Sequence, residues 1–245
     1  MLNGIVSMLA QVEGEKRDNL ILAFCEKLTK APANAVGLAC LKVLWTLYQS
    51  LDAASPMRVH VYFSLVELAG KTDQIGTVYK DMDTLRSAFS PCPPSNEQMQ
   101  MLLRLLHQTL LMAKRSEDAG QVMIELLGTY TTENASQARE EAQRCIVASL
   151  HDPQTFLLDH LLQLKPVKFL EGELIHDLLK IFVSERLEAY TKFYDNHREF
   201  VNNLGLNHEA NMRKVNHTDN KTKNLTIFCI TIFVPPTIIL LRCIA

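Results

Sequence analysis

The sequence predicts an all-α fold of stacked antiparallel helical hairpins. Glycine and proline are sparse, at nine each among 245 residues, whereas a sheet protein of this size needs more of both for its tight turns. Leucine, alanine, glutamate, lysine and glutamine dominate the rest of the chain, and all of them favour helix. Hydrophobic residues make up 47% of the sequence, which is enough for a sizeable core.

Start and stop signals divide residues 1–214 into helices joined by short turns. Ser95 with Gln98, and Asn134 with Gln137, have the spacing of capping boxes. A left-handed residue is expected beyond three apolar stretches, at Gly70, Gly128 and Gly205. Turns this short force successive helices to lie antiparallel. The predicted helices span residues 1–11, 16–30, 34–51, 56–70, 76–89, 96–114, 117–128, 135–150, 154–164, 173–184, 186–203 and 207–214.

Apolar periodicity indicates how these helices pack. Helix 96–114 carries one stripe at helical spacing, and Met101, Leu105 and Met112 widen its apolar surface beyond that stripe. Helix 173–184 is likewise apolar on two sides, so both helices are expected to lie between neighbours. Helix 135–150 has one polar face and should lie at a surface. The run from Leu127 to Tyr130 is similar to part of a tetratricopeptide signature, but no 34-residue period recurs, so any repeats are degenerate.

Charge and cysteine usage narrow the class of protein. The formal net charge is −2, which gives no sign of a phosphate-binding surface for nucleic acid. Six cysteines lie far apart without a C-x-x-C pair, and Cys25, Cys40 and Cys145 fall in apolar helical patterns where a free thiol behaves as a small hydrophobe. The first residues lack the features of a signal peptide. We therefore expect a reducing, cytoplasmic setting.

Sequence patterns for catalysis are missing. The chain has no nucleotide-binding glycine loop, no hydrolase nucleophile elbow and no H-E-x-x-H. Glu173 and His176 share one helical face, as in di-iron bundles, but such sites need a second E-x-x-H pair. Adjacent Asp159 and His160 point about 100° apart on a helix, and nearby Cys145 lies in an apolar pattern. We expect no enzyme activity, catalytic residue, metal, cofactor or small-molecule substrate.

One connection between helices stands out as a candidate site. Pro166 ends a helix, and two lysines flank an apolar group before the next helix begins with acidic residues. A packed interhelical connection is one interpretation. The other is a partner-contact loop, because exposed loops on rigid scaffolds often carry binding residues. Its candidate contact residues are Lys165, Lys168, Phe169, Glu171 and Glu173.

Two long runs resemble a known family. They are VMIELLGTYTTENASQAR from Val122 and FLLDHLLQLKPVKFLEGELIHDLL from Phe156, and the similarity continues to about Lys214. Both resemble the M subunits of eukaryotic translation initiation factor 3, which are PCI-type proteins. The resemblance implies a helical-repeat arm leading into a winged helix, and a non-catalytic scaffold role that supports assembly on the small ribosomal subunit and mRNA recruitment. It implies other subunits of that factor and the small ribosomal subunit as partners.

The end of the chain departs from that family. We expect residues 1–214 to form the helical-repeat arm, residues 215–224 a polar linker, and residues 225–245 an apolar tail where the winged helix would be. Leu225–Leu241 would make only about 26 Å of helix against a membrane core of about 30 Å, and Pro235 would break it, so we expect no membrane contact. The alternatives are a scaffold of another PCI complex, such as the proteasome lid or the signalosome, and a membrane-tethered helical adaptor.

Overall fold

The computed structural model describes residue 4, residues 14–152 and residues 158–216. Every regular element in these ranges is a helix, which confirms the all-α class. The chain divides into two compact units, Met1–Thr129 and Tyr130–Ala245. The predicted helix 1–11, apart from residue 4, and the predicted apolar tail lie outside the described residues.

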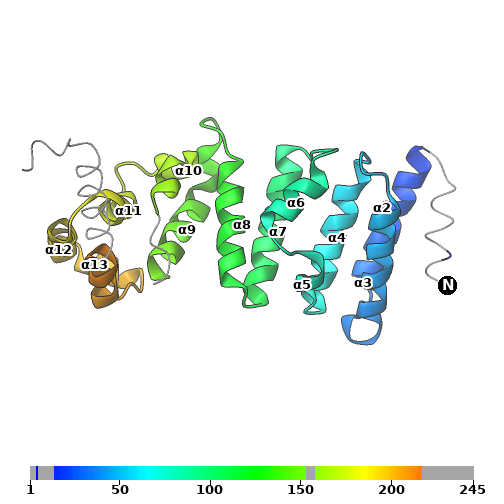
Figure 1. Ribbon diagram of the computed structural model, residues 1–245, viewed down its shortest axis with the longest axis horizontal. Helices are drawn as coiled ribbons and strands as arrows, with labels where there is room; N and C mark the ends of the chain where they lie inside the picture. The colour runs from blue at the N-terminus through cyan, green and yellow to red at the C-terminus, as the bar shows by residue number, and fades with distance from the viewer. Residues whose placement is uncertain (1–3, 5–13, 153–157, 217–245) are drawn as a thin grey trace, which may run out of the picture. The chain divides into compact units, whose positions relative to one another are not determined.

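The first unit is a row of hairpins. Helix α4 packs against α2, α3 and α7, and α7 packs in turn against α8. Neighbouring helices of this unit lie side by side in alternating directions, as the sequence predicts (Figure 1). The capping box at Ser95 and Gln98 is present and begins α7. The elements are α2 (Glu15–Thr29), α3 (Ala33–Ser50), α4 (Met57–Lys71), α5 (Ile75–Val78), α6 (Met82–Phe89), α7 (Asn96–Met112) and α8 (Ser116–Gly128).

Helices α4 and α7 approach each other closely at Gly70. Gly70 sits inside α4, and a Cβ atom built on it would lie 2.8 Å from Cγ2 of Thr109 in α7. The prediction of a left-handed Gly70 is therefore wrong, because this glycine is used for close packing within the helix. The left-handed residue after α4 is Asp73, at φ 55°, and the amide of Gln74 then donates to the carbonyl of Ala69 over 2.8 Å.

The predicted helix 76–89 is interrupted. Helix α5 ends at Val78, and α6 begins after Asp81, whose carboxylate accepts the amide of Thr84 over 2.7 Å. The freed carbonyl of Val78 accepts a hydrogen bond from the Tyr62 hydroxyl at 3.2 Å. The sequence does not predict this break between α5 and α6, because a donor to the freed carbonyl, the Tyr62 hydroxyl, lies in another helix.

Helix α7 is buried on one side only. Leu102, Leu103 and Leu106 are fully buried, in agreement with the predicted stripe. Helix α7 lies between α4 and α8, as expected, but Met101 and Met112 are 58% and 65% exposed, so the wider apolar surface predicted for this helix is not covered at these two residues. The exposed side chains also include Leu111, which is 50% exposed.

The second unit is built around α9. Helix α9 packs against α10 and α11, and α11 packs against α12 (Figure 1). The predicted polar face of helix 135–150 is exposed at Arg139, Glu140 and Arg144. The elements are η1 (Ala135–Ala138), α9 (Arg139–His151), η2 (Asp159–Gln163), α10 (Lys165–Lys168), α11 (Leu174–Ser184), α12 (Leu187–Asn196), α13 (Arg198–Asn203) and a helix over residues 208–216.

Two predicted features of this unit are wrong. Asn134 does not cap a helix, because its side-chain oxygen accepts the amide of Thr131 over 2.7 Å and a 3₁₀ turn follows. The predicted helix 186–203 is split at His197, where φ is −134° and the backbone leaves the helical region. Nothing local to His197 in the sequence signals this break.

The chain after α13 turns as predicted. Gly205 has φ 70°, and the amide of Leu206 donates to the carbonyl of Val201 over 3.3 Å, which is a Schellman arrangement. Asn207 then caps the next helix by accepting the amide of Ala210 over 3.0 Å. This helix includes Val215, which is fully buried and is the first residue of the predicted linker. Residues 217–224 of that linker lie outside the described residues.

Candidate functional site

The candidate segment between η2 and α11 contains a short helix rather than an irregular loop. Residues Lys165–Lys168 form α10, with Pro166 in its first turn, where its missing amide costs no hydrogen bond. Val167 and Leu170 are fully buried, so the apolar group is part of the core. The packed-connection interpretation therefore holds for these two residues.

The five predicted contact residues differ in exposure. Lys165, Lys168, Phe169 and Glu171 are exposed, and Phe169 keeps 52% of its surface accessible. A phenylalanine this exposed beside two buried apolar residues is held at the surface by the helical turn itself. The structure thus presents an exposed aromatic ring directly after Lys168 and one helical turn after Lys165.

Glu173, the fifth candidate, is half-buried, and two side chains of α9 bind its carboxylate. Gln143 donates from Nε2 to its carboxylate over 3.0 Å, and Arg139 forms an ion pair with it over 3.0 Å. Glu173 also precedes α11 directly, where a negative charge is favoured by the helix dipole. These contacts fix the carboxylate at the junction of α9 and α11.

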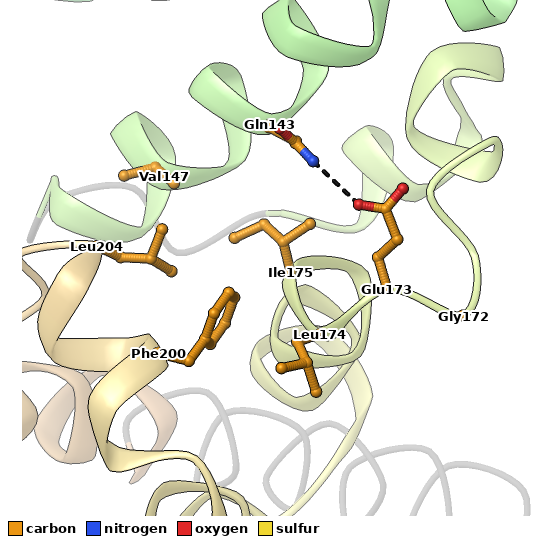
Figure 2. A pocket seen from close by; sticks show the side chains of 8 residues that line it. All are labelled: Gln143, Val147, Gly172, Glu173, Leu174, Ile175, Phe200 and Leu204. Carbon is orange, nitrogen blue, oxygen red and sulfur yellow. Dashed lines mark hydrogen bonds between the residues drawn. The ribbon is translucent and has the colours of Figure 1, made fainter.

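A pocket of about 450 Å³ opens beside Glu173 (Figure 2). Figure 2 shows Val147 of α9, Leu174 and Ile175 of α11, and Phe200 of α13 facing one space. Its volume is within the range of pockets that hold ligands or single large side chains. The complete lining is Gln143, Val147, Gly172, Glu173, Leu174, Ile175, Phe200 and Leu204.

Only Glu173 among the predicted contact residues lines this pocket. Its apolar walls were missed because Val147, Phe200 and Leu204 each look like ordinary core positions of their own helices. All three are only half-buried, so part of each apolar surface is still open to solvent. Helix periodicity reports which side is apolar but not whether a neighbour covers it.

The residues weighed for catalysis or metal binding do not assemble into a site. Within the described ranges, no group of three or more histidine, cysteine, aspartate or glutamate side chains is placed to hold a metal. Glu173 is directed at Gln143 and Arg139, and Asp159 and His160 are exposed on η2. Burial raises the pKa of the Cys145 thiol to about 11, which keeps it protonated and unreactive at neutral pH.

A membrane-tethered adaptor was one of the alternatives suggested by the apolar end of the sequence. None of the helices in the described part of the chain combines the length and apolar character needed to cross a membrane. The apolar stretch Leu225–Leu241 lies outside the described residues.

The described fold and site define an all-α protein of stacked helical hairpins whose distinctive surface is an apolar pocket beside a charged, aromatic segment. No protein-family model matches the chain. Over 215 residues, 88% of its length, the chain is 58% identical to eukaryotic translation initiation factor 3 subunit M of Aedes aegypti and of Culex quinquefasciatus. It is 56% identical over the same length to that subunit of Drosophila melanogaster. The chain spans about 55% of the length of these relatives.

These identities confirm the resemblance to subunit M of eukaryotic translation initiation factor 3. At 58% identity over 215 residues, a shared fold follows for the matched part of the chain. The relatives are named as subunits of an initiation factor rather than as enzymes.

Proposed function

We propose that this chain is a non-catalytic scaffold subunit of the eukaryotic translation initiation factor 3 complex. In this role it supports assembly on the small ribosomal subunit and mRNA recruitment in the cytoplasm, and it needs no cofactor. The observation that carries the proposal is the 58% identity to subunit M over 88% of the chain. The proposed working part is the helical-repeat arm of residues 1–214, and its proposed partners are other subunits of the same factor.

Its proposed contact surface is the exposed side of α10 with the residues that follow. Phe169 is the expected anchor, because aromatic side chains supply much of the binding energy at protein interfaces. Completely burying a phenylalanine contributes about 1.5–3 kcal/mol, and Phe169 still has 52% of its surface to bury. Lys165 and Lys168 precede it by one helical turn and by one residue, and they would select an acidic partner surface.

Affinity purification of the tagged full chain, followed by mass spectrometry, tests the complex. The proposal expects other initiation factor 3 subunits and small-subunit ribosomal proteins among the recovered proteins. Recovery of proteasome-lid or signalosome subunits instead would assign the chain to another PCI complex and contradict the proposal.

The contact surface is tested with a triple variant, Phe169→Ala with Lys165→Glu and Lys168→Glu. Recovery of initiation factor subunits should fall about tenfold, which corresponds to about 1.4 kcal/mol. Matched controls are Met112→Ala, an exposed apolar residue on α7, and Lys192→Glu, an exposed lysine on α12. Equal recovery by the triple variant and the controls would remove this surface from the proposal.

A further inference from the structure

We infer that Ser90, at the end of α6, is a phosphorylation site for a proline-directed protein kinase. The inference is independent of the proposed function, because it rests on α6 and the connection that follows it. In the reaction, the Ser90 hydroxyl oxygen bonds to the γ-phosphorus of ATP and the bond from that phosphorus to the bridging oxygen breaks, which releases ADP. The hydroxyl proton passes to a base of the kinase. The kinase and Mg²⁺-bound ATP are the co-reactants that the chain itself does not supply.

The sequence around Ser90 has the dipeptide that this class of kinase requires. Such kinases accept serine or threonine followed directly by proline, and Ser90 is followed by Pro91. Proline fits a binding surface that offers no acceptor at that position, because it has no amide hydrogen to leave unpaired. Serine or threonine precedes proline at only one other position in the chain, Ser55 before Pro56. The two serines can therefore be compared within one molecule.

Ser90 lies where a kinase could bind an extended segment. Ser90, Pro91 and Pro93 are exposed, and the chain between α6 and α7 consists of turns and irregular backbone. Proline disfavours the α conformation in the residue before it, which biases Cys92 and Pro93 toward extended backbone. Ser90 itself is helical, with φ −57° and ψ −39°, although it too precedes proline. The end of α6 therefore opens at little cost into the extended form that a kinase binds.

Ser55 provides the contrast to Ser90. It is half-buried, and its hydroxyl accepts the amide of Met57 over 3.3 Å. Met57 is the first residue of α4 and is 6% exposed, so the residues after Pro56 cannot extend without unfolding the start of that helix. We therefore expect Ser90 to be modified and Ser55 to be protected, although both precede proline.

A phosphate on Ser90 would act on the contact between α6 and α8. It adds a charge of about −1.5 to −2 at the carboxyl end of α6, where the helix dipole disfavours negative charge. Arg86 lies one helical turn before Ser90 and pairs with Glu125 of α8, with its Nε 3.2 Å from a carboxylate oxygen. It also pairs with Asp83 over 3.1 Å. The phosphate would compete with both carboxylates for Arg86, so we expect the last turn of α6 to separate more readily from α8.

Incubation of the purified full chain with a mitogen-activated or cyclin-dependent protein kinase and Mg²⁺-bound ATP, followed by peptide mass spectrometry, tests the site. Phosphate should enter at Ser90 about tenfold faster than at Ser55, or more, because Ser55 requires local unfolding. Pro91→Ala should abolish incorporation at Ser90, and Pro93→Ala is the matched control, since it changes another exposed proline of the same connection. No incorporation at Ser90, equal rates at the two serines, or incorporation that Pro91→Ala leaves unchanged would overturn the inference.

The same modification is expected in cells. Peptide mapping of the tagged full chain, recovered from eukaryotic cells with phosphatases inhibited, should find phosphate on Ser90 and none in the Ser90→Ala variant. A chain that carries phosphate on other serines but not on Ser90 would contradict the inference.

Hydrogen exchange tests the effect of the phosphate on α6. Amides of residues 86–89 should exchange about tenfold faster in the phosphorylated chain, which corresponds to about 1.4 kcal/mol, whereas those of α2 should not change. In Arg86→Gln the phosphate should add less, because the ion pair with Glu125 is already lost. Unchanged exchange in α6 after complete phosphorylation of Ser90 would overturn the competition for Arg86.

Discussion

The guanidinium of Arg115 donates a hydrogen bond from Nη1 to the carbonyl oxygen of Tyr79 over 3.0 Å. Its Nη2 reaches the carbonyl of Lys80 over 3.1 Å, and its Nε donates to Asp118 over 2.7 Å. One side chain at the start of α8 therefore satisfies the two carbonyls that are released where α5 stops and α6 has not yet begun. The ring of Tyr79 lies 5.6 Å from the same guanidinium.

Replacing Arg115 with methionine should destabilise the first unit. The carbonyls of Tyr79 and Lys80 would lose charged donors, and such losses cost about 1–3 kcal/mol. Chemical denaturation followed by circular dichroism measures the change. Lys30→Met is the control, because its ion pair with Glu26 is exposed and should contribute little. Equal stability of the two variants would show that Arg115 does not hold the break.

Gly70→Ala should also destabilise the first unit, although alanine favours helix. The new Cβ would lie 2.8 Å from Cγ2 of Thr109, and overpacking of this kind costs about 1–3 kcal/mol. Adding Thr109→Ser should restore most of the loss, because serine removes the methyl group and keeps the hydroxyl that donates to Leu105.

Gly120→Ala provides the contrasting control for Gly70. Gly120 also lies inside a helix, but no neighbouring atom lies within 4 Å of the position that a Cβ atom would take there. Alanine there should stabilise the chain by about 0.5–1 kcal/mol. A Gly70→Ala variant that is as stable as Gly120→Ala would contradict the close approach of α4 and α7.

Lys214 predicts a pH dependence of stability in the second unit. Its Nζ donates to the carbonyls of Ser149 and Asp152, over 2.7 and 2.6 Å, at the end of α9. Burial lowers the pKa of this ammonium to about 8 from 10.5, and the Asp152 carboxylate opposes the shift only in part. Between these two values the unfolded chain binds more protons than the folded chain, so the free energy of unfolding rises with pH.

Lys214→Met should remove that rise. The free energy of unfolding of the unmodified chain, relative to the variant, should increase by about 1–2 kcal/mol between about pH 7.5 and about pH 9.5. Urea denaturation at both pH values measures the difference, and titration of other groups cancels in the comparison. Parallel pH profiles would mean that Lys214 is not the titrating group.

The cysteines of the described residues should differ in alkylation rate. Burial raises the pKa of the thiols of Cys25 and Cys145 to about 11, whereas Cys92 is half-buried and more accessible. Iodoacetamide at neutral pH should modify Cys92 first and the two buried thiols only on unfolding, as peptide mass spectrometry would show. Early modification of Cys145 would contradict its burial in α9.

Much of the fold could be predicted from local signals. Apolar stripes and caps such as Ser95 fixed the helices that became α7 and α11 to within a few residues. The breaks within the predicted helices 76–89 and 186–203 were not predictable in this way. The first depends on Arg115, which lies 36 residues from Tyr79 in sequence. Left-handed Asp73 was missed because helix ends of this kind are usually marked by glycine.

The candidate site was predictable only in part. Exposed Phe169 and the lysines beside it follow from the pattern around Pro166, although the pattern did not show that Val167 and Leu170 would be buried. The pocket depends on Val147 and Phe200, which are far apart in sequence and meet only when α9, α11 and α13 fold together. Whether packing covers an apolar side of a helix is decided by tertiary structure, which local periodicity does not report.

Sedimentation of the tagged full chain through a sucrose gradient, after fixation in cells, tests its role as an initiation factor subunit most directly. The proposed function predicts a peak together with small ribosomal subunits and other initiation factor 3 subunits, and a shift toward the top of the gradient for the Phe169, Lys165 and Lys168 triple variant. If the chain stays at the top of the gradient and does not sediment with small ribosomal subunits, that result would contradict the proposed function.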